Sequence, residues 1–448
     1  MSAAARAREL LAGRVVWNVN STARGGGVAE MLQGLLAYGR GAGVDTRWLV
    51  IHGDPQFFRI TKAVHNALHG SLDGRADFGT DDRAHYEAVL QHNLAALVEV
   101  VRPGDIVLLH DPQTAGLVEG LRRHGAYAVW RSHVGRDTPN QATDRAWEFL
   151  HPYVEQAHTF VFSRREYVPP LLQPDQVRVI APSIDPFSEK NRSLDEKDVD
   201  AVLCTVGLAA GEHHTRELAF TRRDGTAGQI RPNVGLLWKT APPPLHAPLV
   251  VQVSRWDHLK DMAGVLTAFV DHVAADAPDA HLVLAGPDVA GVSDDPEGAA
   301  VLTACREAWA KVPEPVRTRC HLASLPMDDG AENALMVNAL QRHAAVAVQK
   351  SLVEGFGLTV TEAMWKGRPV VASAVGGIQD QVTDGVEGLL VPDPADLAEF
   401  GRLVCTVLAD PERGQQLGAR AHDRVQDHYL GDRQLIEWVA LFADLLGA

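Results

Sequence analysis

Two positively charged side chains follow an apolar run in the second half of the sequence, and together they could hold a diphosphate. Arg255 comes directly after the run PLVVQVS, and Lys260 follows it by five residues. Arginine offers phosphate oxygens a planar fork of N–H donors, and lysine offers them a mobile point charge. The alternative is a solvated, charged loop that binds no ligand. Taken alone, the two residues indicate a phosphate site but do not decide between these interpretations.

Two glutamates flank a glycine-containing turn in the segment EGFGLTVTE, with Glu354 before the turn and Glu362 eight residues later. Glycines at a helix start let backbone N–H groups meet an oxyanion, and a carboxylate accepts hydrogen bonds from vicinal hydroxyls. The alternative is that neither acid binds a ligand. Glu354 would then be an acid at a helix start, which the helix dipole favours, and Glu362 would be an acid on the surface of that helix. Because two cations lie in the same half of the chain, we favour a ligand site. Its backbone donors would be Gly355, Phe356, Gly357 and Leu358.

A second glycine-rich turn, Gly25–Gly27, lies near the start of the chain between an apolar run and a helical pattern. A dinucleotide-binding fingerprint needs a third glycine where this sequence has Glu30, although Asp54 at the end of the next strand is a point in its favour. A tight turn without a ligand is the other alternative. We expect Gly26 and Gly27 to close over a phosphate or a sugar, because glycine lets the backbone approach a ligand closely.

Polar residues also end two apolar runs of the first half. Asp111 follows DIVLLH, and His133 follows AYAVWRS. Open parallel sheets bind ligands at the carboxyl ends of their strands, so we expect both side chains at a site, although a lone histidine is often structural. Lys62 and Asn66 lie in a segment with helical spacing. They could hold a small hydroxylated acceptor, and an exposed helix face is the alternative.

The elements that must position these residues alternate between short apolar strands and helices, which predicts parallel sheets covered on both faces. This alternation weakens between residues 185 and 248, where charged residues, glycine and proline indicate an insertion or a connection. The expected strands are residues 14–20, 47–51, 105–110, 126–131, 159–163 and 177–180 in the first half, and 248–254, 281–285, 344–349, 368–372 and 388–391 in the second.

We therefore predict an α/β protein with two doubly wound, Rossmann-like domains facing a deep cleft. The first domain is expected over residues 1–240, with an insertion at about 186–240, and the second over residues 241–448. A helix at about residues 436–446 ends the chain. We expect this last helix to pack back on the first domain.

The composition limits the class of ligand. The 448-residue chain has 42 Lys and Arg against 57 Asp and Glu, a formal net charge of −15, which argues against nucleic acid and anionic membranes. Its four cysteines lack metal-ligand spacing, and no apolar stretch is long enough to span a bilayer. We expect a cytoplasmic enzyme without a cofactor. The sequence does not point to Mg²⁺, and it is compatible with a homodimer.

The sequence resembles the retaining glycosyltransferases of family 4, which have the GT-B fold. The resemblance rests on the Glu354 and Glu362 pair and on Arg255 with Lys260. Within that family it is similar to the glycosyltransferring trehalose synthases and the trehalose phosphorylases, over nearly the whole chain. The motifs that carry this, in order, are NVNSTARGGGVAE (18–30), GDPQFF (53–58), HNAL (65–68), HDPQ (110–113), WRSH (130–133), SIDPFSEKN (183–191) and QVSRWD (252–257).

The resemblance implies a hexosyltransferase that moves glucose from a nucleoside diphosphate to a second glucose, with retention, and forms α,α-trehalose. It implies that Arg255 and Lys260 hold the phosphates, that Glu354 holds donor-sugar hydroxyls and that Glu362 holds the ribose. The implied catalytic residues are His133, Glu354, Arg255 and Lys260. Gly26 and Gly27 join the donor site, and the residues expected at the acceptor are Asp111, Lys62 and Asn66.

Three alternatives stay open on the sequence alone. A trehalose phosphorylase would need an additional anion subsite, which the sequence does not separate from a diphosphate site. Another family 4 transferase would use a different acceptor. A nucleotide-sugar sensor without activity would not need the whole set of cations and acids, which is intact here. The stretch GEHHTRELAFTRRDG (211–225), within the segment 185–248, does not match what we expect of the family, so it leaves the acceptor undetermined.

Overall fold

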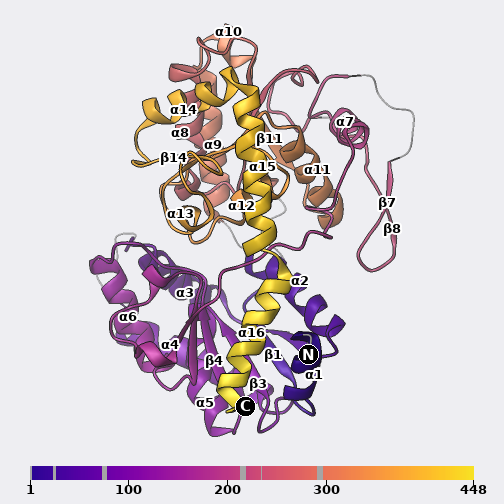
Figure 1. Ribbon diagram of the computed structural model, residues 1–448. Helices are drawn as coiled ribbons and strands as arrows, with labels where there is room; N and C mark the ends of the chain where they lie inside the picture. The colour runs from indigo at the N-terminus through magenta and orange to yellow at the C-terminus, as the bar shows by residue number, and fades with distance from the viewer. Residues whose placement is uncertain are drawn as a thin grey trace. The chain divides into compact units, whose positions relative to one another are not determined.

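The computed structural model describes residues 3–23, 27–72, 78–211, 218–233, 235–289 and 296–447 (Figure 1). The chain divides into two compact units. The first comprises Met1–Ile184 and Tyr429–Ala448, and the second comprises Asp185–His428. Each unit is an α/β structure with its own sheet.

The first unit contains a six-stranded sheet in which all paired strands run parallel, in the order β2-β1-β3-β4-β5-β6. Its strands begin and end within two residues of the runs expected from the sequence. They are β1 Val16–Asn20, β2 Thr46–Val50, β3 Ile106–His110, β4 Tyr127–Ser132, β5 Thr159–Phe162 and β6 Val177–Val179.

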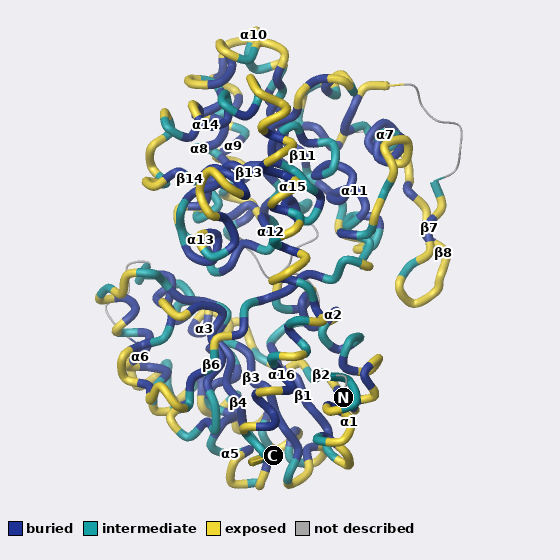
Figure 2. Tube along the Cα trace, in the orientation of Figure 1, coloured by how far each residue is buried: buried dark blue, intermediate teal, exposed yellow. Residues whose placement is uncertain are grey.

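Helices cover both faces of this sheet because alternate strand residues point to opposite sides. Trp17, Leu109 and Trp130 belong to the core under one set of helices, and Val16 and Leu108 belong to the core under the other. The first set is α3 Pro55–Leu68, α4 Thr80–Leu97, α5 Val118–Arg123 and α6 Gln141–Val154, and the second is α1 Ala3–Leu10, α2 Gly27–Gly41 and α16 Gly431–Leu446. Figure 2 shows the strands as buried and the outer helix faces as exposed.

The last helix of the chain, α16, completes the first unit. Trp438 and Phe442 of α16 are buried in the same core as strand residues of the first sheet. Gln434 accepts a hydrogen bond from Ser183 (Oγ to Oε1, 2.8 Å), and the ring of Trp438 lies 5.2 Å from the guanidinium carbon of Arg131. The chain therefore returns to its first unit after the second is complete.

The second unit contains another six-stranded parallel sheet, in the order β11-β10-β9-β12-β13-β14. Its strands are β9 Leu249–Val253, β10 His281–Pro287, β11 Cys320–Leu325, β12 Val346–Gln349, β13 Val370–Ser373 and β14 Leu389–Val391. Strand β11 was not among the strands expected from the sequence. Its residues read CHLASL, so two polar side chains interrupt the apolar run that marks the other strands.

Helices cover this second sheet on both faces as well. The helices described in this unit are α7 Glu196–Thr205, α8 Met262–His272, α9 Pro296–Lys311, α10 Glu314–Arg317, α11 Gly330–His343, α12 Leu358–Trp365, α13 Ile378–Gln381, α14 Leu397–Ala409 and α15 Pro411–His428. Of these, α8, α11, α12 and α14 contact strands of the sheet directly. A hairpin, β7 Ala219–Thr221 with β8 Ala227–Gln229, forms a separate antiparallel pair. None of the described helices of either unit is long and apolar enough to cross a bilayer.

The domain boundary differs from the expected one. Residues 186–240, which we assigned to the first domain, belong to the second unit, and residues 429–448 belong to the first. The physical reason is a shared core: Val202 and Leu203 of α7 are buried together with Val251 of β9 and Leu340 of α11. The charged and turn-forming residues of this segment hide these apolar residues, so it resembles a surface insertion in the sequence.

Candidate active site

Both sheets reverse their strand order beside their first strand. In the second unit, β9 has β10 on one side and β12 on the other. In the first unit, β1 has β2 on one side and β3 on the other. Crevices outside the carboxyl ends of such strands are the usual ligand sites of open α/β sheets.

In the second unit the structure brings Lys260 and Glu354 together. Lys260 follows β9 in the 3-10 turn His258–Lys260, and Glu354 follows β12. Nζ of Lys260 donates to both carboxylate oxygens of Glu354, at 2.7 Å each, and Oγ of Ser351 donates to Oε2 at 3.1 Å. The two side chains are only 17% and 9% exposed. A lysine held in this way can exchange a carboxylate for phosphate oxygens when an anion enters.

A buried ion pair supports the loop that carries Lys260. Asp261 has a left-handed backbone (φ 46°), and its carboxylate accepts from the N–H of Gly264 at the start of α8 (3.0 Å). Nζ of Lys350, a fully buried residue, pairs with Oδ2 of the same carboxylate. Sequence reasoning missed Lys350. The feature that could have identified Lys350 is its position directly after the apolar strand β12, because a charged side chain buried there needs an ionic partner.

Arg255 lies close to Lys260 along the chain but makes a different contact. Its Nη2 is 3.3 Å from Oδ2 of Asp257, and its side chain is 48% exposed. The guanidinium therefore keeps much of its hydration, and a ligand can reach it from solvent.

The turn before α12 has the backbone geometry expected from its glycines. Gly357 precedes the helix with φ 86°, a left-handed conformation that favours glycine. Gln381, fully buried, donates from Nε2 to the carbonyl oxygen of Phe356 (2.5 Å) and accepts from Oγ1 of Thr361 (2.7 Å). The turn therefore presents the first N–H groups of α12, which start at Leu358, in a fixed position. Sequence reasoning did not assign this role to Gln381.

The conformation of Gly357 gives a testable prediction. A Cβ at this position would lie 3.1 Å from Cγ1 of Ile378 and 3.3 Å from Cγ of Glu354. We expect Gly357→Ala to lower the free energy of unfolding by about 1–2 kcal/mol, because a left-handed backbone is costly for residues with a Cβ. Urea denaturation measures this, with Gly330→Ala as the control, since a Cβ there meets nothing within 4 Å. Equal stability of the two variants would contradict the prediction.

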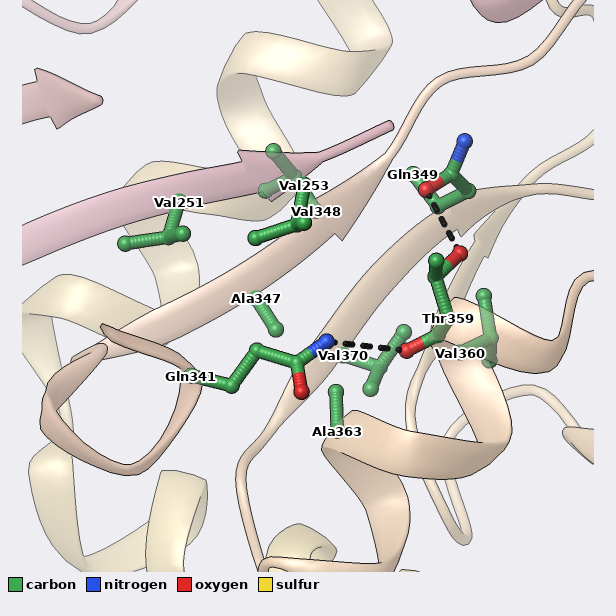
Figure 3. Close-up of a pocket in the computed structure, with 10 residues that line it drawn as sticks. All are labelled: Val251, Val253, Gln341, Ala347, Val348, Gln349, Thr359, Val360, Ala363 and Val370. Atoms are coloured by element: carbon green, nitrogen blue, oxygen red, sulfur yellow. Dashed lines mark hydrogen bonds between the residues drawn. The ribbon is translucent and has the colours of Figure 1, made fainter. Parts of the chain in front are cut away.

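The small cavity behind this turn has a structural role. Figure 3 shows Gln341 of α11 donating to the carbonyl oxygen of Thr359 (3.4 Å), and Oγ1 of Thr359 donating to Gln349 (3.1 Å). The remaining lining residues in the view are apolar. The cavity measures about 10 Å³, room for roughly one water molecule and far too little for a sugar.

Glu362, the second predicted acid, lies within α12 and is buried. Nζ of Lys190 lies 3.6 Å from its Oε1. One turn further along the helix, Lys366 is also buried and donates to Oδ1 of Asn191 (3.0 Å) and to the carbonyl oxygen of Glu362 (3.2 Å). Burial lowers the pKa of Lys366 to about 7, against the opposing effect of the Glu362 carboxylate. Glu362 is therefore an ionisable group surrounded by amines.

In the first unit the structure brings Asp111 and His133 together. Asp111 follows β3 and has a strained backbone (φ 63°, ψ 179°), and His133 follows the neighbouring strand β4. Oδ1 of Asp111 accepts from the backbone N–H of His133 (2.8 Å). The ring of His133 bonds to His110, a residue that we did not assign to the site. A non-glycine residue in such a conformation is most common where function requires it.

The Asp111 carboxyl predicts a pH-dependent stability. Burial raises its pKa to about 7, against the opposing effects of the His133 N–H and the Arg131 charge. An unfolded aspartate has a pKa of about 3.9. The folded chain therefore binds the additional proton between about pH 4 and pH 7, and stability falls as the pH rises through this range. Each unit of difference corresponds to about 1.4 kcal/mol.

We accordingly expect Asp111→Asn to raise the melting temperature at pH 8 and to lose that advantage toward pH 5, because asparagine keeps the acceptor oxygen without the charge. Circular dichroism at the two pH values measures the difference. Asp279→Asn, an exposed acid, is the control and should give the same small change at both. An Asp111→Asn variant that is less stable than the parent at pH 8 would show that the carboxylate is stabilised in the folded chain.

The remaining predicted residues of the first unit are placed as follows. Gly27 is the first residue of α2, and Gly26 lies outside the described residues. Lys62 and Asn66 lie on α3, where Lys62 is exposed and Asn66 is half-buried. Thr61, the residue before Lys62, is buried.

One group of side chains in the described residues has the composition of a metal site. Asp257, His258 and Glu297 offer ligand atoms within 4.8 Å of one another. The three residues already have partners: Nδ1 of His258 contacts Glu297, and Asp257 contacts Arg255 and accepts from the N–H of Leu259. An exposed histidine beside a carboxylate is a common ion pair, and this group carries no conclusion about metal.

Comparison with known proteins decides the family. Residues 18–169 match the profile "Trehalose synthase, N-terminal domain", and residues 239–424 match "Glycosyl transferases group 1". A trehalose synthase of Rubrobacter xylanophilus is 34% identical over 98% of this chain and 93% of its own length. The chain belongs to the trehalose synthase family. The family is one of glycosyltransferases.

Two further comparisons place the trehalose synthase family among its neighbours. A trehalose phosphorylase of Pleurotus pulmonarius is 26% identical over 86% of this chain, which spans 51% of that protein. The solved α,α-trehalose-phosphate synthase (UDP-forming) of Burkholderia vietnamiensis has a TM-score of 0.68 and 15% identity, covering 97% of this chain and 99% of that one. This likeness shows the fold, and with the two six-stranded parallel sheets it confirms the GT-B prediction.

Proposed function

We propose that this chain transfers the glucosyl group of a nucleoside diphosphate glucose to glucose, with retention at the anomeric carbon, and so makes α,α-trehalose. The observation that carries the proposal is the 34% identity to a trehalose synthase across both units. The Lys260–Glu354 pair at the switch point of the second sheet supports it, because a diphosphate sugar needs a cation and a hydroxyl acceptor at one place.

The second unit supplies the donor site in this proposal. Arg255, Lys260 and the backbone N–H groups at the start of α12 stabilise the charge that develops on the leaving diphosphate. Glu354 gives up part of its contact with Lys260 to accept from donor-sugar hydroxyls, and Glu362 accepts from the ribose. These roles follow from the family resemblance, and the contacts of Lys260 and Glu354 are compatible with them.

Retention is best served by a front-face reaction. Glycosidases that retain configuration through a covalent intermediate use a carboxylate nucleophile and a second carboxyl about 5 Å away. In this proposal Glu354 accepts from donor-sugar hydroxyls and Glu362 from the ribose, so neither acid is assigned as the nucleophile. The leaving phosphate is then the group that takes the acceptor proton as the new bond forms. Arg255 and Lys260 hold that phosphate in place.

The first unit supplies the acceptor site. We propose that Asp111, Lys62 and Asn66 bind the acceptor sugar, that His133 lies near the reacting carbon, and that Gly26 and Gly27 close beside the phosphates. The strained backbone of Asp111 and its bond to the His133 N–H support a site at the ends of β3 and β4. We also propose that the four cysteines, none of which forms a disulfide, reflect a cytoplasmic location, and that the chain forms a homodimer.

The test runs the reaction backwards. The purified protein is incubated with trehalose and UDP or ADP in one arm, and with trehalose and inorganic phosphate in the other. We expect nucleoside diphosphate glucose and glucose, identified by mass, in the first arm only. Glucose 1-phosphate in the second arm would make the protein a phosphorylase. Absence of both products would show that the acceptor is another sugar or that the chain has lost activity, which a panel of acceptors with nucleoside diphosphate glucose separates.

A further inference from the structure

Three polar side chains in the first unit form a hydrogen-bonded chain that ends at His133. Asn18 lies on β1, His110 is the last residue of β3, and His133 follows β4, so the three come from neighbouring strands. Oδ1 of Asn18 lies 3.2 Å from Nε2 of His110, and Nδ1 of His110 lies 3.0 Å from Nε2 of His133. Each histidine ring therefore uses a defined nitrogen for each contact.

The two ends of this chain differ in their exposure. Asn18 and His110 are each 1% exposed, whereas His133 is half-buried. The two imidazole rings are close to coplanar, with centroids 5.3 Å apart and planes 13° apart. The backbone N–H of His133 is held by Asp111 as well. One nitrogen of the His133 ring is therefore held by His110, and Asp111 holds the backbone of the same residue.

Burial keeps both rings neutral. Removal from water lowers the pKa of His110 to about 3 and lowers that of His133 well below its usual value, and the nearby Arg131 charge acts in the same direction. A neutral imidazole carries one N–H donor and one nitrogen lone pair. The position of each proton is then set by the partner on the other side of the ring.

The amide oxygen of Asn18 determines which atom donates in each hydrogen bond from Asn18 through His110 to His133. An amide oxygen only accepts hydrogen bonds, so Nε2 of His110 carries the proton and Nδ1 of His110 is a lone pair. That lone pair accepts from Nε2–H of His133. Nδ1 of His133 is consequently a lone pair, and the His133 ring makes no other hydrogen bond within the described part of the chain.

We propose that Asn18 and His110 are positioning residues that fix the tautomer and orientation of His133, so that Nδ1 of His133 accepts a hydrogen bond from a sugar hydroxyl. The proposal rests on the proposed function, since it assumes a sugar at this edge of the first sheet. It deepens that function because it assigns His133 to hydroxyl recognition. A ring with a lone pair toward the ligand cannot donate to the leaving phosphate.

The first experiment determines the tautomer without any substrate. Protein labelled with ¹⁵N-histidine is examined by long-range ¹H–¹⁵N correlation NMR, and the signals are assigned by their loss in His110→Leu and His133→Ala. We expect both rings to be neutral, with the proton on Nε2. In the Asn18→Leu variant we expect His110 to lose its preference for the Nε2–H tautomer. A substantial Nδ1–H or imidazolium form of His133 in the parent protein overturns the proposal, whether or not the chain makes trehalose.

The second experiment separates positioning from simple structural support. If His110 acts through His133, His110→Leu lowers kcat roughly tenfold, the factor that one ordinary hydrogen bond supplies. When His133 has already been replaced by alanine, the same His110→Leu substitution changes kcat by no more than about twofold, because the residue through which His110 acts is absent. UDP affinity stays unchanged in every variant. Equal losses in both backgrounds show a structural role and overturn the proposal. His110→Asn, whose amide oxygen can accept from His133, restores most of the rate.

The second unit offers a matched control. His281 and His321 form a similar pair, with Nδ1 to Nε2 at 3.0 Å and rings 5.3 Å apart at 8°. This pair lies at the amino ends of β10 and β11, the opposite edge from the predicted site. His321→Leu should lower stability as a buried change does but leave kcat unchanged. A loss of kcat equal to that of His110→Leu would trace both effects to stability and overturn the proposal.

Discussion

Replacing Lys260 by methionine is expected to lower the turnover of nucleoside diphosphate glucose by a factor of roughly 100–1,000. This factor is the loss of turnover expected when one preorganised group that stabilises charge in the transition state is removed. Methionine keeps much of the aliphatic stem and removes only the charge. Because Lys260 holds both oxygens of the buried Glu354, the variant also loses stability. Turnover is therefore measured well below the melting temperature, under saturating donor and glucose.

A matched variant controls for the loss of a positive charge. Lys311 is exposed at the end of α9 in the same unit, and Lys311→Met should retain the parent rate. A Lys260→Met rate within a few-fold of the parent would remove Lys260 from the donor site. The family membership would stand in that case, because it does not depend on this residue.

The strands could be predicted because a parallel sheet covered on both faces needs continuous apolar runs. The run DIVLLH became β3 and PLVVQVS became β9, each within two residues. Asp111 and Arg255 directly follow these two runs, so both could be predicted to lie at the carboxyl ends of strands. This part of the site follows from local sequence, since a residue after a buried strand lies at the edge of the sheet wherever that strand is placed.

The pairings across the sheets could not be predicted in the same way. Lys260 and Glu354 are 94 positions apart, and their contact depends on β9 lying beside β12. The bond between His110 and His133 likewise depends on β3 lying beside β4. Strand order is a property of the whole chain, so the sequence locates these residues at an edge without showing which of them meet.

The error in the domain boundary has a related cause. The segment 186–240 contains charged and turn-forming residues, so its local composition indicates an exposed insertion. Val199 and Leu203 are nevertheless buried against residues of α11, more than 130 positions away. Their contribution to a core becomes visible only when the distant helix is in place.

Glu354→Gln is expected to lower kcat/KM for the donor by roughly 100-fold or more, because it removes a buried acceptor and its charge while keeping the shape of the side chain. The amide oxygen can still accept from Ser351, which now bonds to Oε2 at 3.1 Å. Lys260 keeps its own charge but loses the carboxylate charge of Glu354, with which it makes both of its contacts. Retention of the parent kcat/KM would remove Glu354 from the donor site.

The double variant Lys260→Met/Glu354→Gln shows whether the two residues act as one unit. Residues in direct contact give non-additive effects, so the double variant should be about as slow as the slower single variant. Its stability should exceed that of Lys260→Met alone, because a buried carboxylate without its lysine costs more than a neutral amide beside methionine. Urea denaturation and initial rates measure the two effects. Fully additive losses in both would mean that the contact between Lys260 and Glu354 contributes neither to the fold nor to the reaction.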